Sequence, residues 1–216
     1  MNRADSRRLL VPWLLGASLA MSTVGTGASA PSVVQMDALD KSCQACHGMY
    51  GEGMPAASAP RLAGQAADYL QKQLNDYASG ARENPIMVSF AKQLSEIQRA
   101  NLATYYASQR AQFATSTIQT TPAQLARGRQ LAKQGDETLR AQACNNCHGP
   151  DGSGLPHSAP YLAGQSAEYL TAELRSWQEG TRHNDAGKLM ASVAERLREA
   201  DIQAAAAYYA SLTSGG

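Results

Sequence analysis

The sequence predicts an all-α protein that consists of two tandem domains related by internal duplication. Short segments recur in the same order about 100 residues apart, which indicates a repeated domain. Apolar residues in both copies fall at the spacing of an amphipathic helix. Neither copy contains a run of alternating β-branched residues, so no strand is predicted. The recurring segments are residues 43–48 and 144–149, 59–65 and 159–165, and 105–108 and 208–211.

A central helix is predicted in each copy. Leu70, Leu74 and Tyr77 lie at positions i, i+4 and i+7, which places them on one helical face. The second copy repeats this stripe as Leu170, Leu174 and Trp177. The segments before these helices, 48–64 and 149–164, are crowded with Gly, Pro and Ser and are predicted to be long loops. Loops of this length in a small domain usually enclose a ligand.

Three other helices have recognisable sequence features. Ser95 and Gln98 have the spacing of a capping box. Thr121 and Pro122 have the residue types of an N-cap and a first helical position, and they predict the start of the second copy's first helix. Near the C-terminus, a helical face is formed by Ile202, Ala205, Ala206 and Tyr209.

The N-terminus has the features of a cleaved signal peptide spanning residues 1–30. Three arginines precede an apolar stretch, and Ala28-Ser29-Ala30 has the small residues of a cleavage site. The apolar stretch is interrupted and is too short for a membrane anchor. We therefore expect an exported, soluble protein, with peripheral membrane association as a further possibility. The predicted domains are 31–112 and 122–216, joined by a Thr- and Ser-rich linker at 113–121.

Charge and composition exclude one class of partner. The chain has 19 basic and 18 acidic residues, and loss of residues 1–30 removes three Arg and one Asp, which changes the formal charge from +1 to −1. No basic surface of the kind that nucleic acids need is indicated, so no nucleic-acid partner is expected.

All four cysteines lie in a Cys-x-x-Cys-His motif that occurs twice, with Cys43, Cys46 and His47 in the first copy. The second motif consists of Cys144, Cys147 and His148. A disulfide pair would leave both histidines unexplained, a zinc site needs four ligands in one place, and a thioredoxin-like pair needs a βαβ setting. Covalent attachment of haem c explains all six residues, because two thiols bind the two vinyl groups and the histidine ligates iron. Two haem c groups are therefore predicted.

The sixth iron ligands are predicted to be Met87 and Met190. When the copies are aligned from their C-terminal ends, the two methionines fall in register, each seven residues before a leucine. Met49 and Met54 follow His47 too closely to reach the opposite haem face. The remaining histidines, His157 and His183, have no histidine counterpart in the first copy and are expected to be exposed to solvent.

Two further pairs of residues have predicted roles around the haem. The carbonyls of Pro60 and Pro160 are expected to accept a hydrogen bond from the second ring nitrogen of each ligand histidine. Arg82 and Arg182 recur just before the methionine segments and either pair with haem propionates or are solvated surface residues.

The chain resembles the dihaem cytochromes c4. The residues that carry the resemblance are 144–154, the Pro-x-Leu-Ala-Gly-Gln segments at 60–65 and 160–165, the Gly-x-Arg segments at 80–82 and 180–182, the methionines and the closing Tyr-Tyr-Ala-Ser. The resemblance covers nearly all of the mature chain. It implies two class I cytochrome c domains, His/Met ligation in both, and a periplasmic electron carrier with the bc1 complex as donor and a terminal oxidase as acceptor.

Filled axial positions favour an electron carrier over an enzyme, because no coordination site is open to a substrate. A dihaem peroxidase would need one haem with a mobile or missing sixth ligand, and the matched methionines argue against this. A dihaem electron-transfer subunit of a periplasmic dehydrogenase would have the same ligands as a free carrier, so the sequence leaves this alternative open.

Overall fold

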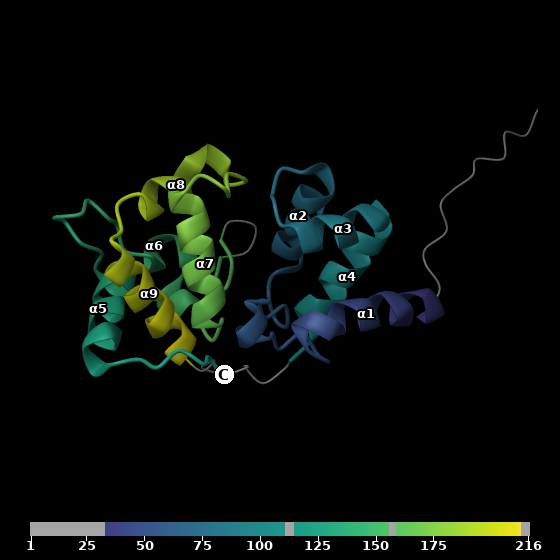
Figure 1. Cartoon of the computed structure of the whole chain (residues 1–216), viewed down its shortest axis with the longest axis horizontal. Coiled ribbons are helices and arrows are strands. Elements are labelled where there is room, and N and C mark those ends of the chain that lie inside the picture. The colour runs from purple at the N-terminus through teal and green to yellow at the C-terminus, as the bar shows by residue number, and fades with distance from the viewer. Residues whose placement is uncertain (1–32, 111–114, 156–158, 213–216) are drawn as a thin grey trace, which may run out of the picture.

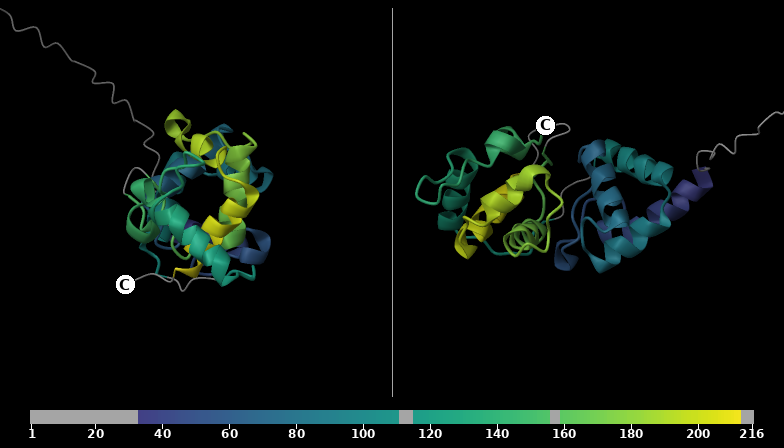
Figure 2. Two further views of the ribbon diagram at one scale, coloured as in Figure 1. Left: turned by 90° about the vertical axis from the view of Figure 1, so that its left-hand side faces the viewer. Right: turned by 90° about the horizontal axis from the view of Figure 1, so that it is seen from above.

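The described residues of the computed structural model, 33–110, 115–155 and 159–212, form two helical lobes that lie side by side (Figures 1 and 2). We call α1–α4 with their loops lobe one, and α5–α9 with their loops lobe two. The described residues contain no β-sheet, and their only extended pairings are isolated bridges in loops. The prediction of an all-α protein with two tandem domains is confirmed.

Lobe one contains four helices and one short 3-10 turn. They are α1 (Val33–His47), η1 (Pro55–Ala57), α2 (Ala67–Ser79), α3 (Pro85–Gln93) and α4 (Glu96–Ser108). The predicted stripe faces inward on α2, where Leu70 and Tyr77 are buried. The predicted capping box is present at α4, because the Ser95 side chain accepts from the N–H of Gln98 and the Gln98 side chain accepts from the N–H of Ser95. α2 packs against α3 and α4.

Lobe two has the corresponding elements in the same order, with its first helix divided. They are α5 (Pro122–Lys133), α6 (Asn145–His148), η2 (Pro150–Gly152), α7 (Ala167–Gln178), η3 (Ala186–Lys188), α8 (Leu189–Ala194) and α9 (Glu199–Ser211). Thr121 caps α5 and Pro122 occupies its first turn, as predicted. α9 packs against both α5 and α7.

The segments outside these lobes bear on two predictions. The predicted signal peptide, residues 1–30, lies outside the described residues. Residues 115–121, within the predicted linker, form no helix, and the domain boundaries stay predictions. Among the described residues, no helix has both the length and the apolar character needed to cross a membrane.

The two lobes meet through a symmetric set of hydrogen bonds between corresponding loops. The backbone N–H of Arg61 donates to Gln165 Oε1 (2.9 Å), and Gln165 Nε2 donates to the Arg61 carbonyl (3.1 Å). Tyr161 and Gln65 repeat this exchange at 2.9 and 3.0 Å. Because residues 61 and 65 correspond to 161 and 165 in the repeat, the contact is approximately two-fold, like the contact in a symmetric dimer.

Candidate haem-binding sites

In lobe one the cysteine motif forms the last turn of α1. Cys43 is partly buried and Cys46 is exposed, and the helix ends at His47. Gly48 has a φ of +82°, a left-handed conformation that glycine adopts without strain. The chain then turns back, and the N–H of Gly53 donates to the carbonyl of His47 (2.7 Å).

In lobe two the motif lies on a short separate helix. Cys144 directly precedes α6, which ends at His148, and Gly149 has a φ of +75°. The N–H of Gly154 donates to the carbonyl of His148 (2.7 Å), which repeats the contact in lobe one. Cys144 is partly buried and Cys147 is exposed. The two motifs therefore have the same local geometry although the preceding helices differ.

The histidines of both motifs, which are the predicted iron ligands, are buried, and the predicted proline carbonyls orient them. His47 Nδ1 donates to the Pro60 carbonyl at 2.8 Å, and His148 Nδ1 donates to the Pro160 carbonyl at 2.9 Å. Burial lowers the pKa of both imidazoles, although the hydrogen bonds to proline oppose this effect. A neutral ring that donates from Nδ1 keeps the lone pair of Nε2 for a metal. The predicted hydrogen bonds are confirmed.

A tight loop places each proline carbonyl. In lobe one the N–H groups of Leu62 and Ala63 donate to the Gly51 carbonyl (2.8 and 2.9 Å). Gly51 has a φ of +77°, and a Cβ there would lie 2.7 Å from the ring of Tyr106. Gly152 repeats this arrangement against Tyr209 in lobe two. Since no side chain fits at these positions, the loop can close against the Tyr-Tyr helix.

The two predicted methionine ligands lie in the first turns of corresponding helices. Met87 is in α3 and Met190 is in α8, and both side chains are half-buried. Asn84 Oδ1 accepts from the N–H of Met87 (3.0 Å), and Asp185 Oδ2 accepts from the N–H of Met190 (2.8 Å). These two positioning residues were not among the predicted residues, although Asn84-Pro85 has the residue types of an N-cap and a first helical position. The assignment of the methionines as ligands stays a prediction.

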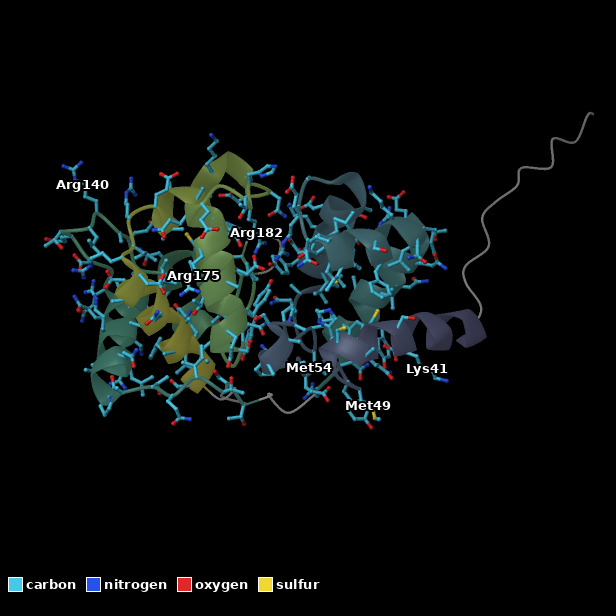
Figure 3. All side chains as sticks on the ribbon, viewed as in Figure 1. Lys41, Met49, Met54, Arg140, Arg175 and Arg182 are labelled. Carbon is cyan, nitrogen blue, oxygen red and sulfur yellow. The ribbon has the colours of Figure 1, made fainter. Side chains whose placement is uncertain are left out.

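The other candidate ligands lie elsewhere. Met49 is 60% exposed and Met54 is 39% exposed, and both lie at the lower edge of lobe one in Figure 3. His183 is exposed, as predicted. His157 lies outside the described residues.

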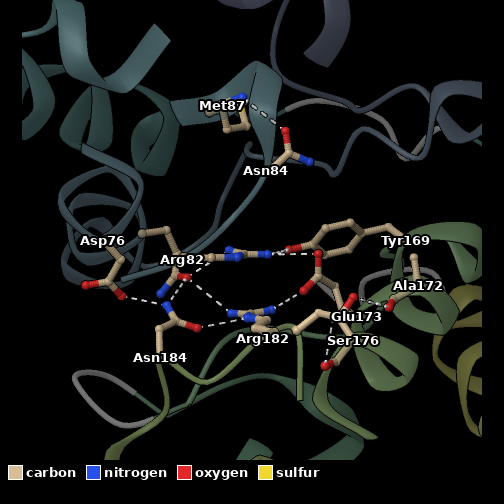
Figure 4. A network of polar contacts seen from close by, with 12 residues as sticks. Asp76, Arg82, Asn84, Met87, Tyr169, Ala172, Glu173, Ser176, Arg182 and Asn184 are labelled. Atoms are coloured by element: carbon tan, nitrogen blue, oxygen red, sulfur yellow. Dashed lines mark hydrogen bonds and ion pairs between the residues drawn. The ribbon is translucent and has the colours of Figure 1, made fainter. Parts of the chain in front are cut away.

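Arg82 and Arg182 are buried where the two lobes meet (Figure 4), so the alternative of solvated surface arginines is wrong. Both guanidinium groups form ion pairs with Glu173 of lobe two; the distance from Arg82 Nη2 to Glu173 Oε1 is 2.8 Å. Both also donate to Gln73 Oε1, at 2.8 Å from Arg82 and 3.1 Å from Arg182. Gln73 and Glu173 correspond in the repeat, but only Glu173 carries a charge. The two arginines therefore share one carboxylate.

The surroundings of the two arginines suit a negatively charged group. A cavity of about 380 Å³ is lined by both arginines together with Tyr77, Tyr169 and Glu173. Burying two cations with one shared carboxylate leaves positive charge that is incompletely compensated, which is costly in a protein interior. A carboxylate group such as a haem propionate would neutralise it. Pairing of the arginines with propionates stays a prediction.

Comparisons with known proteins agree with this geometry. Residues 37–110 and 125–213 each match the cytochrome c family. The chain is 40% identical to a thiosulfate dehydrogenase electron acceptor from Thiomonas intermedia, over 94% of this chain and 90% of that protein. It is 35% identical to cytochrome c4 from Pseudomonas aeruginosa, over 96% of this chain and 98% of that protein.

A solved structure shows the same fold in a larger protein. The structure of thiosulfate dehydrogenase (TsdBA) from Marichromatium purpuratum matches with a TM-score of 0.73 and 37% identity, over 79% of this chain. This chain covers 36% of that protein, so it spans about a third of its length.

Proposed function

This chain is a dihaem member of the cytochrome c family, of the cytochrome c4 type, and on this premise we propose that it accepts electrons from a periplasmic dehydrogenase of the thiosulfate dehydrogenase kind. It carries two covalently bound haem c groups and is an electron carrier. The observation that carries the choice of donor is the 40% identity to a thiosulfate dehydrogenase electron acceptor over nearly the full length of both chains. A cytochrome c4 that matches over a similar length is less similar, at 35%.

We infer the residues that hold the two groups from the two Cys-x-x-Cys-His motifs and from the register of the methionines in the repeat. Cys43 and Cys46 would form the thioethers in lobe one, with His47 and Met87 as axial ligands. Lobe two would use Cys144, Cys147, His148 and Met190 in the same roles. Bound haem c takes up and releases one electron at iron. With protein ligands on both faces no position is open to a substrate, which supports a carrier and argues against a peroxidase.

Two one-electron sites suit a donor that releases electrons in pairs. A dehydrogenation removes two electrons, and one molecule of this protein would take both. The match to part of the thiosulfate dehydrogenase from M. purpuratum supports a close physical association with such an enzyme. The predicted signal peptide and the absence of a membrane-spanning helix among the described residues support a periplasmic location.

A second candidate donor is the bc1 complex, with a terminal oxidase as acceptor. The relatives named cytochrome c4, at 35% and 31% identity over 96% of this chain, favour this route. Both routes would use the same haem groups and the same ligands in each lobe. They differ only in the partner protein that docks.

The test is the rate at which each donor reduces the purified holoprotein. Catalytic amounts of a thiosulfate dehydrogenase with thiosulfate are expected to reduce both haems within seconds, as followed by the α-band of reduced haem c. A bc1 complex with a quinol is expected to act more slowly. A monohaem cytochrome c serves as the control acceptor. Rapid reduction by bc1 alone would overturn the proposed donor, and steady turnover of hydrogen peroxide would overturn the role as a carrier.

A further inference from the structure

The second tyrosine of each Tyr-Tyr pair, Tyr106 or Tyr209, has a different hydrogen-bond partner in the two lobes. In lobe one the Tyr106 hydroxyl donates to Asp40 Oδ1 at 2.6 Å. In lobe two the corresponding Tyr209 hydroxyl donates to Asn145 Oδ1 at 2.7 Å. The geometry of the hydroxyl is therefore conserved, but its acceptor is a carboxylate in lobe one and a neutral amide in lobe two.

Each tyrosine hydroxyl also lies against the first cysteine of its motif. Tyr106 contacts the Cys43 thiol and Tyr209 contacts the Cys144 thiol. Burial and the negative charge of Asp40 raise the pKa of Cys43 to about 11. Burial also raises the pKa of Cys144, but no carboxylate contributes there. The charge of Asp40 thus acts at the haem attachment point of lobe one. The carboxylate near the tyrosine pair of lobe two is Asp151, which accepts from the Tyr208 hydroxyl and forms an ion pair with Lys133.

No cation of the described residues forms an ion pair with Asp40. Its other contact is a hydrogen bond from the Gln44 side-chain amide. The corresponding residue in the motif alignment of lobe two is Ala141, which is buried and apolar.

We propose that Asp40, held by Tyr106, lowers the reduction potential of the lobe-one haem. Ferric haem carries one more positive charge than ferrous haem, so a fixed carboxylate beside the attachment point stabilises the oxidised state. A single electron on the protein is thereby shifted toward lobe two. The inference rests on the proposed haem ligands but is independent of which protein is the donor.

Lobe two has a carboxylate on the opposite side of its site. Asp185 accepts from the N–H groups of Met190 and Ala191, at 2.8 and 3.2 Å. The effect of Asp40 is therefore measured as a shift from the wild-type potential of the same lobe, so that the contribution of Asp185 cancels.

The experiment is a pair of reciprocal charge exchanges in the holoprotein. Asp40→Asn keeps an acceptor for Tyr106 and removes the charge, and it is expected to raise the lobe-one potential. Asn145→Asp puts a negative charge on the residue that accepts from the Tyr209 hydroxyl, and it is expected to lower the reduction potential of the lobe-two haem. Each variant should change the equilibrium constant for electron transfer between the lobes about tenfold, which is about 59 mV for a one-electron couple.

The potentials are read at an electrode with NMR detection of the haem methyl groups, which reports each lobe separately and needs no partner protein. Asn146→Asp is the control, because this exposed neighbour receives the same substitution, whereas the hydrogen-bond acceptor of Tyr209 is Asn145. If Asp40→Asn moves neither potential, or moves both equally, the proposal is wrong. If Asp40→Asn does not fold with haem attached, Asn145→Asp alone tests the proposal. An unchanged reduction potential of the lobe-two haem in that variant then overturns it. A wrong donor would leave all of these shifts in place.

Discussion

The two lobes bind haem with the same motif but build different helical shells around it. In lobe two eight of the thirteen residues of α9 are buried, because α5 packs along this helix and α7 packs against it. In lobe one only three of the thirteen residues of α4 are buried. α1 continues straight into the cysteine motif and runs away from the rest of the lobe (Figure 1).

Individual residues explain the difference. Gly128 of α5 allows close approach to α9, since a Cβ there would lie 2.0 Å from the Ala204 carbonyl oxygen. Lobe one has Asn101 and Thr104 where α9 has Ala204 and Ala207, and Thr104 is exposed. The comparison shows that the loops and glycines at the haem sites tolerate little change, whereas the helices around them diverged after duplication.

The largest expected effect comes from exchanging one axial ligand at a time. Met87→His or Met190→His should abolish the weak methionine-to-iron absorption band of one lobe and leave the other intact. The potential of that lobe should fall by a substantial part of the roughly 0.8 V range that axial ligands span. Redox titration with spectral detection measures both results. Persistence of both bands in either variant would show that the ligand assignment is wrong.

The next effect is specific to lobe two and depends on pH. Asp201 is 1% exposed and pairs with Arg127 and Arg198. Burial raises its pKa, but the hydrogen bonds from the two arginines outweigh burial, so the net pKa is lowered. Its stabilising effect is therefore present above the unfolded pKa of about 3.9 and is lost as the pH falls through the folded pKa. The lobe-one counterpart, Gln98, does not titrate.

Asp201→Ala is expected to cost lobe two about 3 kcal/mol at pH 7, because it removes a buried carboxylate that accepts hydrogen bonds from Arg127 and Arg198. It should also remove the additional acid sensitivity of lobe two. Trp177 is buried in α7 and is the single tryptophan after residue 30, so its fluorescence reports lobe two in urea titrations at pH 3 and pH 7. An unchanged urea midpoint at pH 7 would contradict this prediction.

A smaller effect is expected from filling the contact between α5 and α9. Gly128→Val should destabilise lobe two by about 2 kcal/mol, because the added methyl groups collide with the backbone of α9. Ala126→Val on the exposed side of α5 is the matched control and should be nearly neutral. The same Trp177 urea titration measures both variants. Equal stability of the two variants would mean that the close approach is unimportant.

The smallest effect concerns a second carboxylate in lobe one. Glu52 accepts from the N–H of Tyr50 at 2.8 Å and lies over Gly48, where lobe two has Ser153 over Gly149. Because Glu52 is half-exposed, Glu52→Ser should raise the lobe-one potential by only about a twofold change in the inter-lobe equilibrium constant, and added salt should weaken the effect. Ser153→Glu should produce the opposite shift in lobe two. A shift larger than that of Asp40→Asn would reverse the proposed ranking.

Much of each haem site could be predicted from local sequence. The two cysteine motifs predict the attachment residues, and the repeat places the prolines and methionines in register. Capping at Ser95 and Thr121 followed from side chains that bond to backbone within three residues. The roles of Asn84 and Asp185 do not follow from methionine as an iron ligand, because these residues accept from the backbone N–H of each methionine and not from its side chain.

The sequence by itself determined the duplication, the helical fold and the orientation of each motif histidine by a proline carbonyl, and it predicts the haem attachment residues. These features depend on residue types and short separations along the chain. Only the tertiary structure decided that Arg82 and Arg182 are buried between the lobes and share Glu173, and that Tyr106 is bonded to Asp40 where Tyr209 is bonded to Asn145. Apart from the contact between Arg182 and Glu173, these contacts join residues about 60 to 90 positions apart. Their pairing is fixed by how helices and lobes pack, which no local pattern specifies.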